Sequence, residues 1–289
     1  MLERVSINFN TQVCAVVGNP VSHSLSPAIH NAGYAANELD FVYLPCQVED
    51  LEGMLAGVRA MHNFRGLSVT IPHKVAAMDL VDDVAEADRI IGSINTIVKE
   101  NGRLYGLGTD GPGALKALTD AGVDPDSRTV LLLGCGGAAR AIAFALALNT
   151  KVAELCLLDI DQQVLAGLAS DLESHTPTKI TAEQCSAETL AEAMGRANIV
   201  IHCTPVGMHP KQDVSLVPPD LFRSGQTVFD IVYNPLETRL LREAKERGLK
   251  TISGVEMFIN QAVLQFEYFT GGQAPEEVMR RVVMEHLTR

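Results

Sequence analysis

A lysine and an aspartate in two short motifs have the side chains needed to move a proton. Lys74 ends the segment SVTIPHK at residues 68–74, and Asp110 lies in GTDG at residues 108–111. A lysine that loses part of its hydration beside a strand end can exchange protons near neutral pH. An aspartate in a glycine-rich turn can reach a ligand. Spacing alone favours two solvated surface charges, because most charged side chains are exposed.

A glycine-rich segment further along the chain has the spacing of a dinucleotide-binding loop. Residues 134–139 read GCGGAA and fit the pattern G-x-G-x-x-G/A. An apolar run at 129–133 precedes the segment, and an alanine- and leucine-rich run follows it. Glycines there would let a pyrophosphate approach the backbone amides at a helix N-terminus. We predict that Gly134, Gly136, Gly137 and Ala138 bind it; the alternative is a turn that serves packing alone.

An acidic residue after the next apolar run bears on the choice of cofactor. Asp159 ends the predicted strand at 155–159, where a carboxylate can accept hydrogen bonds from ribose hydroxyls and repel a 2′-phosphate. The next residues, IDQQ, offer no arginine or lysine for such a phosphate. The pattern favours NAD over NADP. A solvated acid at a strand end is the alternative.

Two polar segments can hold a small hydroxylated acid. Ser24 and Ser26 precede Pro27 in SHSLSP, where they can bind a carboxylate at a helix N-terminus or simply cap that helix. Asn95 and Thr96, in GSINT, can bind a ligand hydroxyl or cap a turn.

Alternating strand and helix patterns must position these residues. Short β-branched runs bounded by glycine or proline predict strands, and 3.6-residue periodicity predicts helices. Such an order implies a parallel sheet with helices on both faces. We expect Ser26 to be the N-cap of the helix that Pro27 opens. The predicted strands are 13–18, 41–44, 66–70, 129–134, 155–159, 198–202 and 227–231, and the predicted helices are 27 onward, 50–61, 138–148, 254–266 and the segment after Pro275.

Composition narrows the class of protein. The chain has 289 residues, 47% of them hydrophobic and 20% charged, which allows two domains with full cores. A net charge of −12 argues against a nucleic-acid or anionic-membrane partner. The six cysteines have no metal-ligand spacing, so no metal site is expected. With no signal-like or membrane-spanning run, we expect a cytoplasmic protein that is a monomer or homodimer, with a small-molecule substrate.

Taken together, the motifs resemble the shikimate dehydrogenase family. The resemblance runs in the family's order from about residue 13 to the C-terminal helix. Its motifs are SLSP at 24–27, VTIPHK at 69–74, GSINT at 92–96, TDG at 109–111, GCGGA at 134–138, TPVGM at 204–208, YNP at 233–235, and Glu256-Met257 with Gln261.

The resemblance implies reversible, nicotinamide-dependent reduction of 3-dehydroshikimate to shikimate. Lys74 and Asp110 would be the catalytic pair. The implied substrate-binding residues are Ser24, Ser26, Thr70, Asn95, Tyr233 and Gln261. The implied cofactor-binding residues are the loop residues with Asp159, Thr204 and Gly254.

The resemblance also implies the domain organisation. The α/β fold would comprise an N-terminal α/β substrate domain at 1–111, completed by C-terminal helices at 254–289 that return to it. A Rossmann-type, doubly wound dinucleotide-binding domain would occupy 112–253.

Four departures from the family pattern stand beside these motifs. Ser68 and Gly108 each replace a usual asparagine, His202-Cys203 replaces Asn-Ala, and Asp159-Ile160-Asp161 replaces the Asn-Arg-Thr of NADP-binding members. The last change is similar to the NAD-using quinate/shikimate branch. We predict an NAD-preferring shikimate dehydrogenase. The alternatives are an NAD-dependent quinate/shikimate dehydrogenase and a nucleotide-binding regulatory protein without catalysis.

Overall fold

The computed structural model describes residues 7–288 and divides into two compact units. The first unit contains the described residues up to Thr109 and those from Gln261 onward, and the second is Asp110–Asn260. Helix α10, Gly254–Thr270, contributes to both units. The α/β class predicted from the sequence is confirmed.

The first unit is built on a six-stranded sheet in the order β2-β1-β3-β5-β6-β4. Three strand predictions are confirmed, for β1, β2 and β3, whereas β4, β5 and β6 were not anticipated. The elements are β1 Gln12–Gly18, α1 Ser26–Ala36, β2 Phe41–Gln47, α2 Leu51–Ala60, β3 Phe64–Val69, α3 Ala77–Leu80, β4 Asp83–Val84, α4 Glu86–Ile91, β5 Thr96–Glu100, β6 Arg103–Leu107 and α11 Glu276–Leu287.

This first sheet is mixed, so the prediction of an all-parallel sheet is wrong for it. Strand β5 runs antiparallel to both β3 and β6, while β1 is parallel to β2 and β3. A two-residue turn joins β5 to β6, with φ of 51° at Asn101 and 79° at Gly102. Asn-Gly tolerates positive φ at both turn positions, and such turns close antiparallel hairpins. The Asn-Gly pair was the sequence signal for this hairpin.

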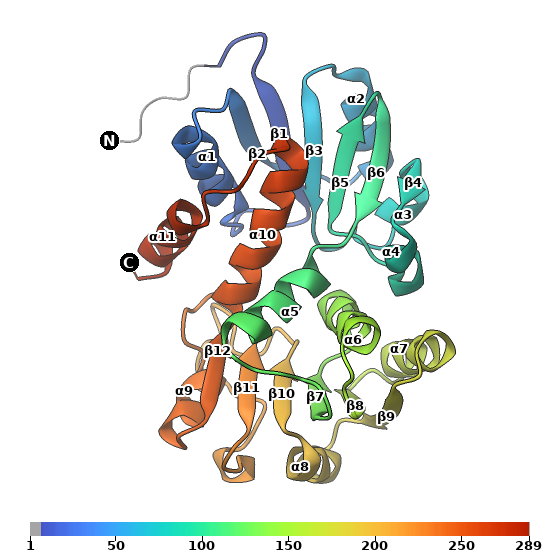
Figure 1. The fold of residues 1–289 in the computed structure, drawn as a ribbon, viewed down its shortest axis with the longest axis vertical. Coiled ribbons are helices and arrows are strands. Elements are labelled where there is room, and N and C mark those ends of the chain that lie inside the picture. Colours follow the sequence, from blue (N-terminus) through green and yellow to red (C-terminus); the bar gives the residue numbers. More distant parts are fainter. Residues whose placement is uncertain (1–6, 289) are drawn as a thin grey trace. The chain divides into compact units, whose positions relative to one another are not determined.

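Helices cover both faces of the first sheet. Helix α2 places Leu51, Leu55 and Val58 in one core with β1 and β3. On the other face, the part of α10 beyond Gln261 supplies Phe266 and Phe269, both fully buried. Helices α1 and α11 pack side by side there (Figure 1).

Helix α1 begins one residue earlier than predicted. Ser26 is its first residue and is buried, while Leu25 is the N-cap and makes no side-chain capping hydrogen bond. The prediction of Ser26 as N-cap is therefore wrong. Its hydroxyl is available for another partner.

The second unit is a fully parallel, six-stranded sheet in the order β12-β11-β10-β7-β8-β9. This is the doubly wound arrangement of dinucleotide-binding domains, whose strand order reverses next to the first strand. Its elements are α5 Asp110–Asp120, β7 Thr129–Leu133, α6 Gly137–Asn149, β8 Glu154–Asp159, α7 Gln162–His175, β9 Lys179–Gln184, α8 Ala187–Arg196, β10 Ile199–His202, the 3-10 helix η1 Pro219–Leu221, β11 Thr227–Asp230, α9 Arg239–Glu246 and β12 Lys250–Ser253.

Burial on both faces explains why the central strands of this sheet are almost wholly apolar. Leu131 and Leu133 face a core shared with α8 and α9, and α6 packs beside α5 and α7 (Figure 1). A strand with two covered faces reads as a continuous hydrophobic run rather than an alternating one. Within residues 7–288, no helix combines the length and apolarity needed to cross a bilayer.

Candidate active site

A buried polar cluster joins three segments of the first unit. Asn95, with 4% of its surface exposed, donates to Thr109 Oγ1 at 3.0 Å through Nδ2. Its Oδ1 accepts from the Thr109 amide at 2.8 Å, and Thr109 Oγ1 lies 3.5 Å from Gln261 Oε1. Asn95 thus fixes the residue directly before Asp110 and sits close to the start of the Gln261 segment.

A second set of hydrogen bonds extends this cluster across the sheet. The Tyr43 hydroxyl donates to Ser68 Oγ at 2.6 Å, and Ser68 donates to Gln265 Oε1 at 2.6 Å. Gln265 Nε2 donates to Thr96 Oγ1 at 2.9 Å. Burial raises the pKa of the Tyr43 phenol, while hydrogen bonds with Ser68 and Ser26 act against that shift. The phenol therefore stays protonated and able to donate.

The serine-rich turn lies just before α1. The Ser24 hydroxyl accepts from the Ser26 amide at 3.3 Å and is half-buried. Ser26 is buried and its hydroxyl contacts the Tyr43 phenol. The two predicted carboxylate-binding serines therefore lie next to each other, with Ser26 connected to the buried cluster.

Lys74 and Thr70 lie on the segment between β3 and α3. Thr70 follows the last residue of β3 and donates its amide to the Val17 carbonyl at 2.9 Å. Lys74 is half-buried, and its carbonyl accepts from the Ile94 amide at 3.0 Å. That bond ties the Lys74 turn to the segment carrying Asn95.

Asp110 is the first residue of α5 and has 9% of its surface exposed. A carboxylate in the first turn of a helix is stabilised by the unpaired amides there. Two residues earlier, the Gly108 amide donates to Asp88 Oδ2 at 2.9 Å. The turn before Asp110 is thereby held by hydrogen bonds at both Gly108 and Thr109.

The glycine loop of the second unit joins β7 to α6 as predicted. Gly134 has φ of 97°, which favours glycine, and Gly136 is the N-cap of α6. A Cβ added to Gly136 would meet no atom within 4 Å, so space is open beside this backbone. Gly136 and Gly137 are exposed at the N-terminus of α6, and exposed amides at a helix N-terminus with open space are suited to a pyrophosphate. These residues fit a dinucleotide.

Asp159 ends β8 next to this loop. Its Oδ2 accepts from the Cys135 amide at 2.6 Å and its Oδ1 from the Asp161 amide at 2.8 Å. A carboxylate has about four acceptor sites, so these two bonds leave capacity for ribose hydroxyls. The neighbouring Ile160 is exposed and uncharged.

Tyr233 and Gly254 lie near each other in the chain's second unit. The Tyr233 ring stacks on Phe258 with centroids 4.5 Å apart, and burial raises the pKa of its phenol. A Cβ at Gly254 would overlap the carbonyl of Ile231. Close backbone approach therefore requires glycine at 254, independently of any cofactor.

Two buried strand-end residues and a half-buried threonine form a further chain of hydrogen bonds. His202 ends β10 and Asp230 ends β11, with 1% and 0% of their surfaces exposed. His202 Nδ1 lies 2.8 Å from Asp230 Oδ1, and His202 Nε2 is hydrogen-bonded to Thr204 Oγ1. Thr204 also lies against Gly134, where a Cβ would come within 2.8 Å of its methyl group.

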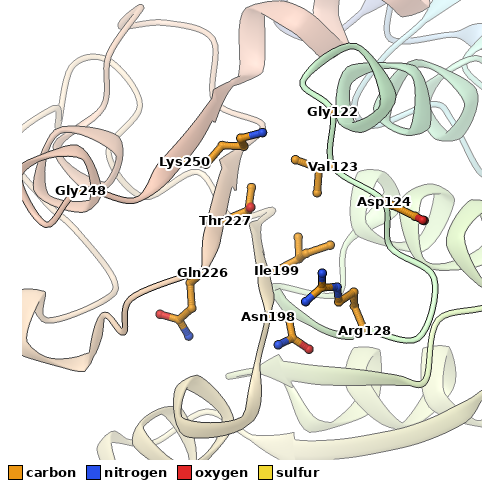
Figure 2. A pocket seen from close by; sticks show the side chains of 11 residues that line it. Gly122, Val123, Asp124, Arg128, Asn198, Ile199, Gln226, Thr227, Gly248 and Lys250 are labelled. Carbon is orange, nitrogen blue, oxygen red and sulfur yellow. The ribbon is translucent and has the colours of Figure 1, made fainter.

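A hollow of about 330 Å³ lies at the amino ends of strands in the second sheet, away from the glycine loop. Figure 2 shows Asn198, Ile199, Thr227 and Lys250 around it, at the amino ends of β10, β11 and β12. Ligands of open α/β sheets bind beyond the carboxyl ends of the strands. This hollow is therefore not the dinucleotide site. Across residues 7–288, no three His, Cys, Asp or Glu side chains are grouped to hold a metal ion.

Comparison with known proteins identifies the family. Residues 16–97 match the model of the shikimate dehydrogenase substrate binding domain, and residues 254–284 match that of the shikimate 5'-dehydrogenase C-terminal domain. The chain is 41% identical over 284 residues to the shikimate dehydrogenase (NADP(+)) of Moorella thermoacetica, covering 97% of this chain and 95% of that protein. The chain belongs to the shikimate dehydrogenase family. It is thus an oxidoreductase that acts on a CH–OH group with a nicotinamide cofactor.

Solved structures of this family have the same fold. Shikimate 5-dehydrogenase from Listeria monocytogenes, in complex with shikimate and NAD, superposes with a TM-score of 0.90 at 33% identity, covering 98% of this chain and 99% of that one. Quinate dehydrogenase from Corynebacterium glutamicum, in complex with NAD, gives 0.88 at 27% identity, covering 95% and 99%. Proteins similar to this chain are thus named for shikimate or for quinate, and with NAD or with NADP.

The structure gives physical reasons for two departures from the family motifs. A Cβ at Gly108 would lie 2.5 Å from Asp88 Oδ1, so Asp88 occupies the space that an asparagine side chain would need. Ser68 is small enough to sit between Tyr43 and Gln265 and hydrogen-bond both. Both departures follow from local packing in this chain.

Sequence reasoning overlooked Tyr43, Gln265 and the Asp230 partner of His202. Tyr43 and Gln265 lie in ordinary strand and helix patterns, which carry no signal of a shared hydrogen-bond network. His202 and Asp230 did carry a signal, because each is a polar residue that ends an apolar strand. Such ends face the ligand side of a parallel sheet.

Proposed function

We propose that this protein is a shikimate dehydrogenase that interconverts 3-dehydroshikimate and shikimate and prefers NAD to NADP. The observation that carries the proposal is the presence of Lys74 and Asp110 within ordered motifs of a chain 41% identical to a named shikimate dehydrogenase. We further propose that the unit ending at Thr109 is the substrate domain and that the parallel-sheet unit binds the dinucleotide.

In the proposed reaction, the chain's own residues handle the substrate and its proton. Ser24 and Ser26 hold the carboxylate, with Tyr233 near it, and the ring hydroxyls are bound by Thr70, Asn95 and Gln261. When shikimate is oxidised, Lys74 takes the hydroxyl proton, and it returns that proton in the reverse direction. Asp110 orients the hydroxyl and Lys74. The nicotinamide, when bound, supplies the acceptor or donor of hydride.

The proposed cofactor preference rests on Asp159. Backbone amides of Cys135 and Asp161 hold its carboxylate beside the glycine loop with acceptor capacity to spare. A fixed negative charge there attracts ribose hydroxyls and repels a 2′-phosphate. Gly134, Gly136, Gly137 and Ala138 would meet the pyrophosphate, with Thr204 and Gly254 toward the nicotinamide.

The deciding experiment crosses shikimate and quinate with NAD and NADP in a spectrophotometric assay. We expect the highest kcat/KM with shikimate and NAD, and K74A should lower kcat by at least about 100-fold, as for loss of a general acid–base group. K151A, at an exposed lysine, is the matched control and should leave kcat unchanged. Activity with NADP alone would refute the cofactor preference.

A second candidate is an NAD-dependent quinate/shikimate dehydrogenase. The NAD complex of a quinate dehydrogenase with 27% identity favours it. Quinate has an extra hydroxyl on the carboxylate-bearing carbon, so the space around Ser24 and Thr70 decides whether it fits. A higher kcat/KM for quinate would select this function. Tight NAD binding without oxidation of either acid would select a non-catalytic nucleotide-binding protein.

A further inference from the structure

The buried His202–Asp230 pair lies on the nicotinamide side of the proposed dinucleotide site. Strand β7, which leads into the glycine loop, has β8 on one side and β10 on the other. In this fold the two nucleotide halves lie on opposite sides of that loop. With the adenosine ribose at Asp159 on the β8 side, the nicotinamide half falls on the β10 side. His202 ends β10 there, paired in register with Asp230 of β11.

The Asp230 carboxylate has hydrogen-bond partners on three sides, as an ionised acceptor would. Its Oδ2 accepts from Thr238 Oγ1 at 2.6 Å, and its Oδ1 accepts from the Val232 amide at 3.0 Å. An ionised carboxylate only accepts, so the contact with His202 Nδ1 requires a hydrogen on that nitrogen. In a neutral imidazole the other nitrogen is then an acceptor. In that neutral form, His202 Nε2 accepts a hydrogen bond.

The direction of this hydrogen bond determines what Thr204 can offer a ligand. With Nε2 as acceptor, the Thr204 hydroxyl donates its hydrogen to the imidazole. Its oxygen also accepts from the Val206 amide at 3.2 Å. A hydroxyl has two acceptor sites, so one remains. Thr204 presents an acceptor, and no donor, to a neighbouring group.

We propose that His202, oriented by Asp230, is a positioning residue that commits Thr204 Oγ1 to accept an N–H from the nicotinamide carboxamide. The inference rests on the proposed function, since it requires a nicotinamide dinucleotide at the glycine loop. It gives a role to a residue that departs from the family, because asparagine is usual at this position. Asparagine can reproduce the arrangement, with its amide nitrogen toward Asp230 and its oxygen toward Thr204.

The test measures dissociation constants of NAD and of its 3-acetylpyridine analogue by calorimetry. The analogue keeps the carbonyl but lacks the N–H donor. One hydrogen bond corresponds to about a tenfold difference in affinity, so the wild-type protein should bind NAD about tenfold more tightly than the analogue. T204V should abolish this preference, and H202F should reduce it, because the freed Thr204 hydrogen can then also donate to the carbonyl that both dinucleotides carry. T204S and H202N, the matched controls, should keep it, and H202F/T204V should behave like T204V alone.

Two results would overturn the inference. One is a T204V protein that retains the preference for NAD over the analogue. The other is an H202F protein that loses thermal stability and whose affinities for NAD and the analogue fall by the same factor, so that the preference is unchanged. A merely structural histidine would produce that result. Failure of the wild-type protein to bind either NAD or NADP would instead refute the proposed function on which the inference rests.

A measurement on the wild-type protein covers the case in which H202F does not fold. Nitrogen-15 NMR of labelled histidine reports which ring nitrogen carries the hydrogen. We expect His202 to carry it on Nδ1. A hydrogen on Nε2, in a neutral or a charged ring, would reverse the direction of the Thr204 bond and overturn the inference.

Discussion

Lowering the pH from 7.5 to 5.5 should destabilise the protein through His30, a fully buried histidine in α1. The imidazole has no exposed surface, and its ring stacks on Tyr43 with centroids 4.4 Å apart and an interplanar angle of 5°. Within the described residues 7–288, neither ring nitrogen has a hydrogen-bond partner. Burial lowers the pKa of His30 from 6.5 to about 3. The folded protein therefore keeps this ring neutral.

The sign and size of the effect follow from proton binding. Below the unfolded-state pKa of 6.5, the unfolded chain protonates His30 and the folded chain does not, so stability falls as the pH falls. Each unit of pH well below that value costs about 1.4 kcal/mol. At pH 5.5 the loss is about 1.4 kcal/mol relative to pH 7.5, and it continues to grow until the pH approaches the folded-state pKa.

The assay compares urea unfolding of the wild-type protein and H30F at the two pH values. Phenylalanine keeps an aromatic ring against Tyr43 but cannot titrate, so H30F should lose about 1.4 kcal/mol less than wild type. Any packing cost of the larger ring cancels, because it is present at both pH values. H62F, at an exposed histidine, should retain the wild-type pH dependence. Equal losses in wild type and H30F would refute the reasoning.

Three further substitutions test other parts of the structure. S68A leaves the Tyr43 hydroxyl and Gln265 without their shared partner and should lower the free energy of unfolding by about 1–3 kcal/mol; an unchanged value would argue against the buried network. G254A should lower it by about 3 kcal/mol because the added methyl overlaps Ile231, and a fully stable G254A would contradict this contact. D159N should weaken NAD binding about tenfold and strengthen NADP binding, as calorimetry would show; unchanged affinities would remove Asp159 from the cofactor site.

Local patterns predicted the second unit better than the first. The segments around residues 129–149 carry an apolar strand, a glycine turn and a helix in adjacent positions, and the structure has these elements as β7, the loop and α6. The hairpin of β5 and β6 was missed, although Asn101-Gly102 marked its turn. Ser26 was misplaced because Leu25, without a capping side chain, precedes the helix.

The sequence by itself determined the family and the chemistry that its motifs bring, because those motifs are short, ordered and local. It also predicted which residues carry the proposed proton transfer, and it places an acidic residue at position 159. Only the tertiary structure decided which polar groups meet. Ser68 meets Gln265 across 197 positions, and His202 meets Asp230 across 28, because neighbouring strands and helices bring them together. Hydrogen-bond partners depend on register and packing, which no short motif encodes.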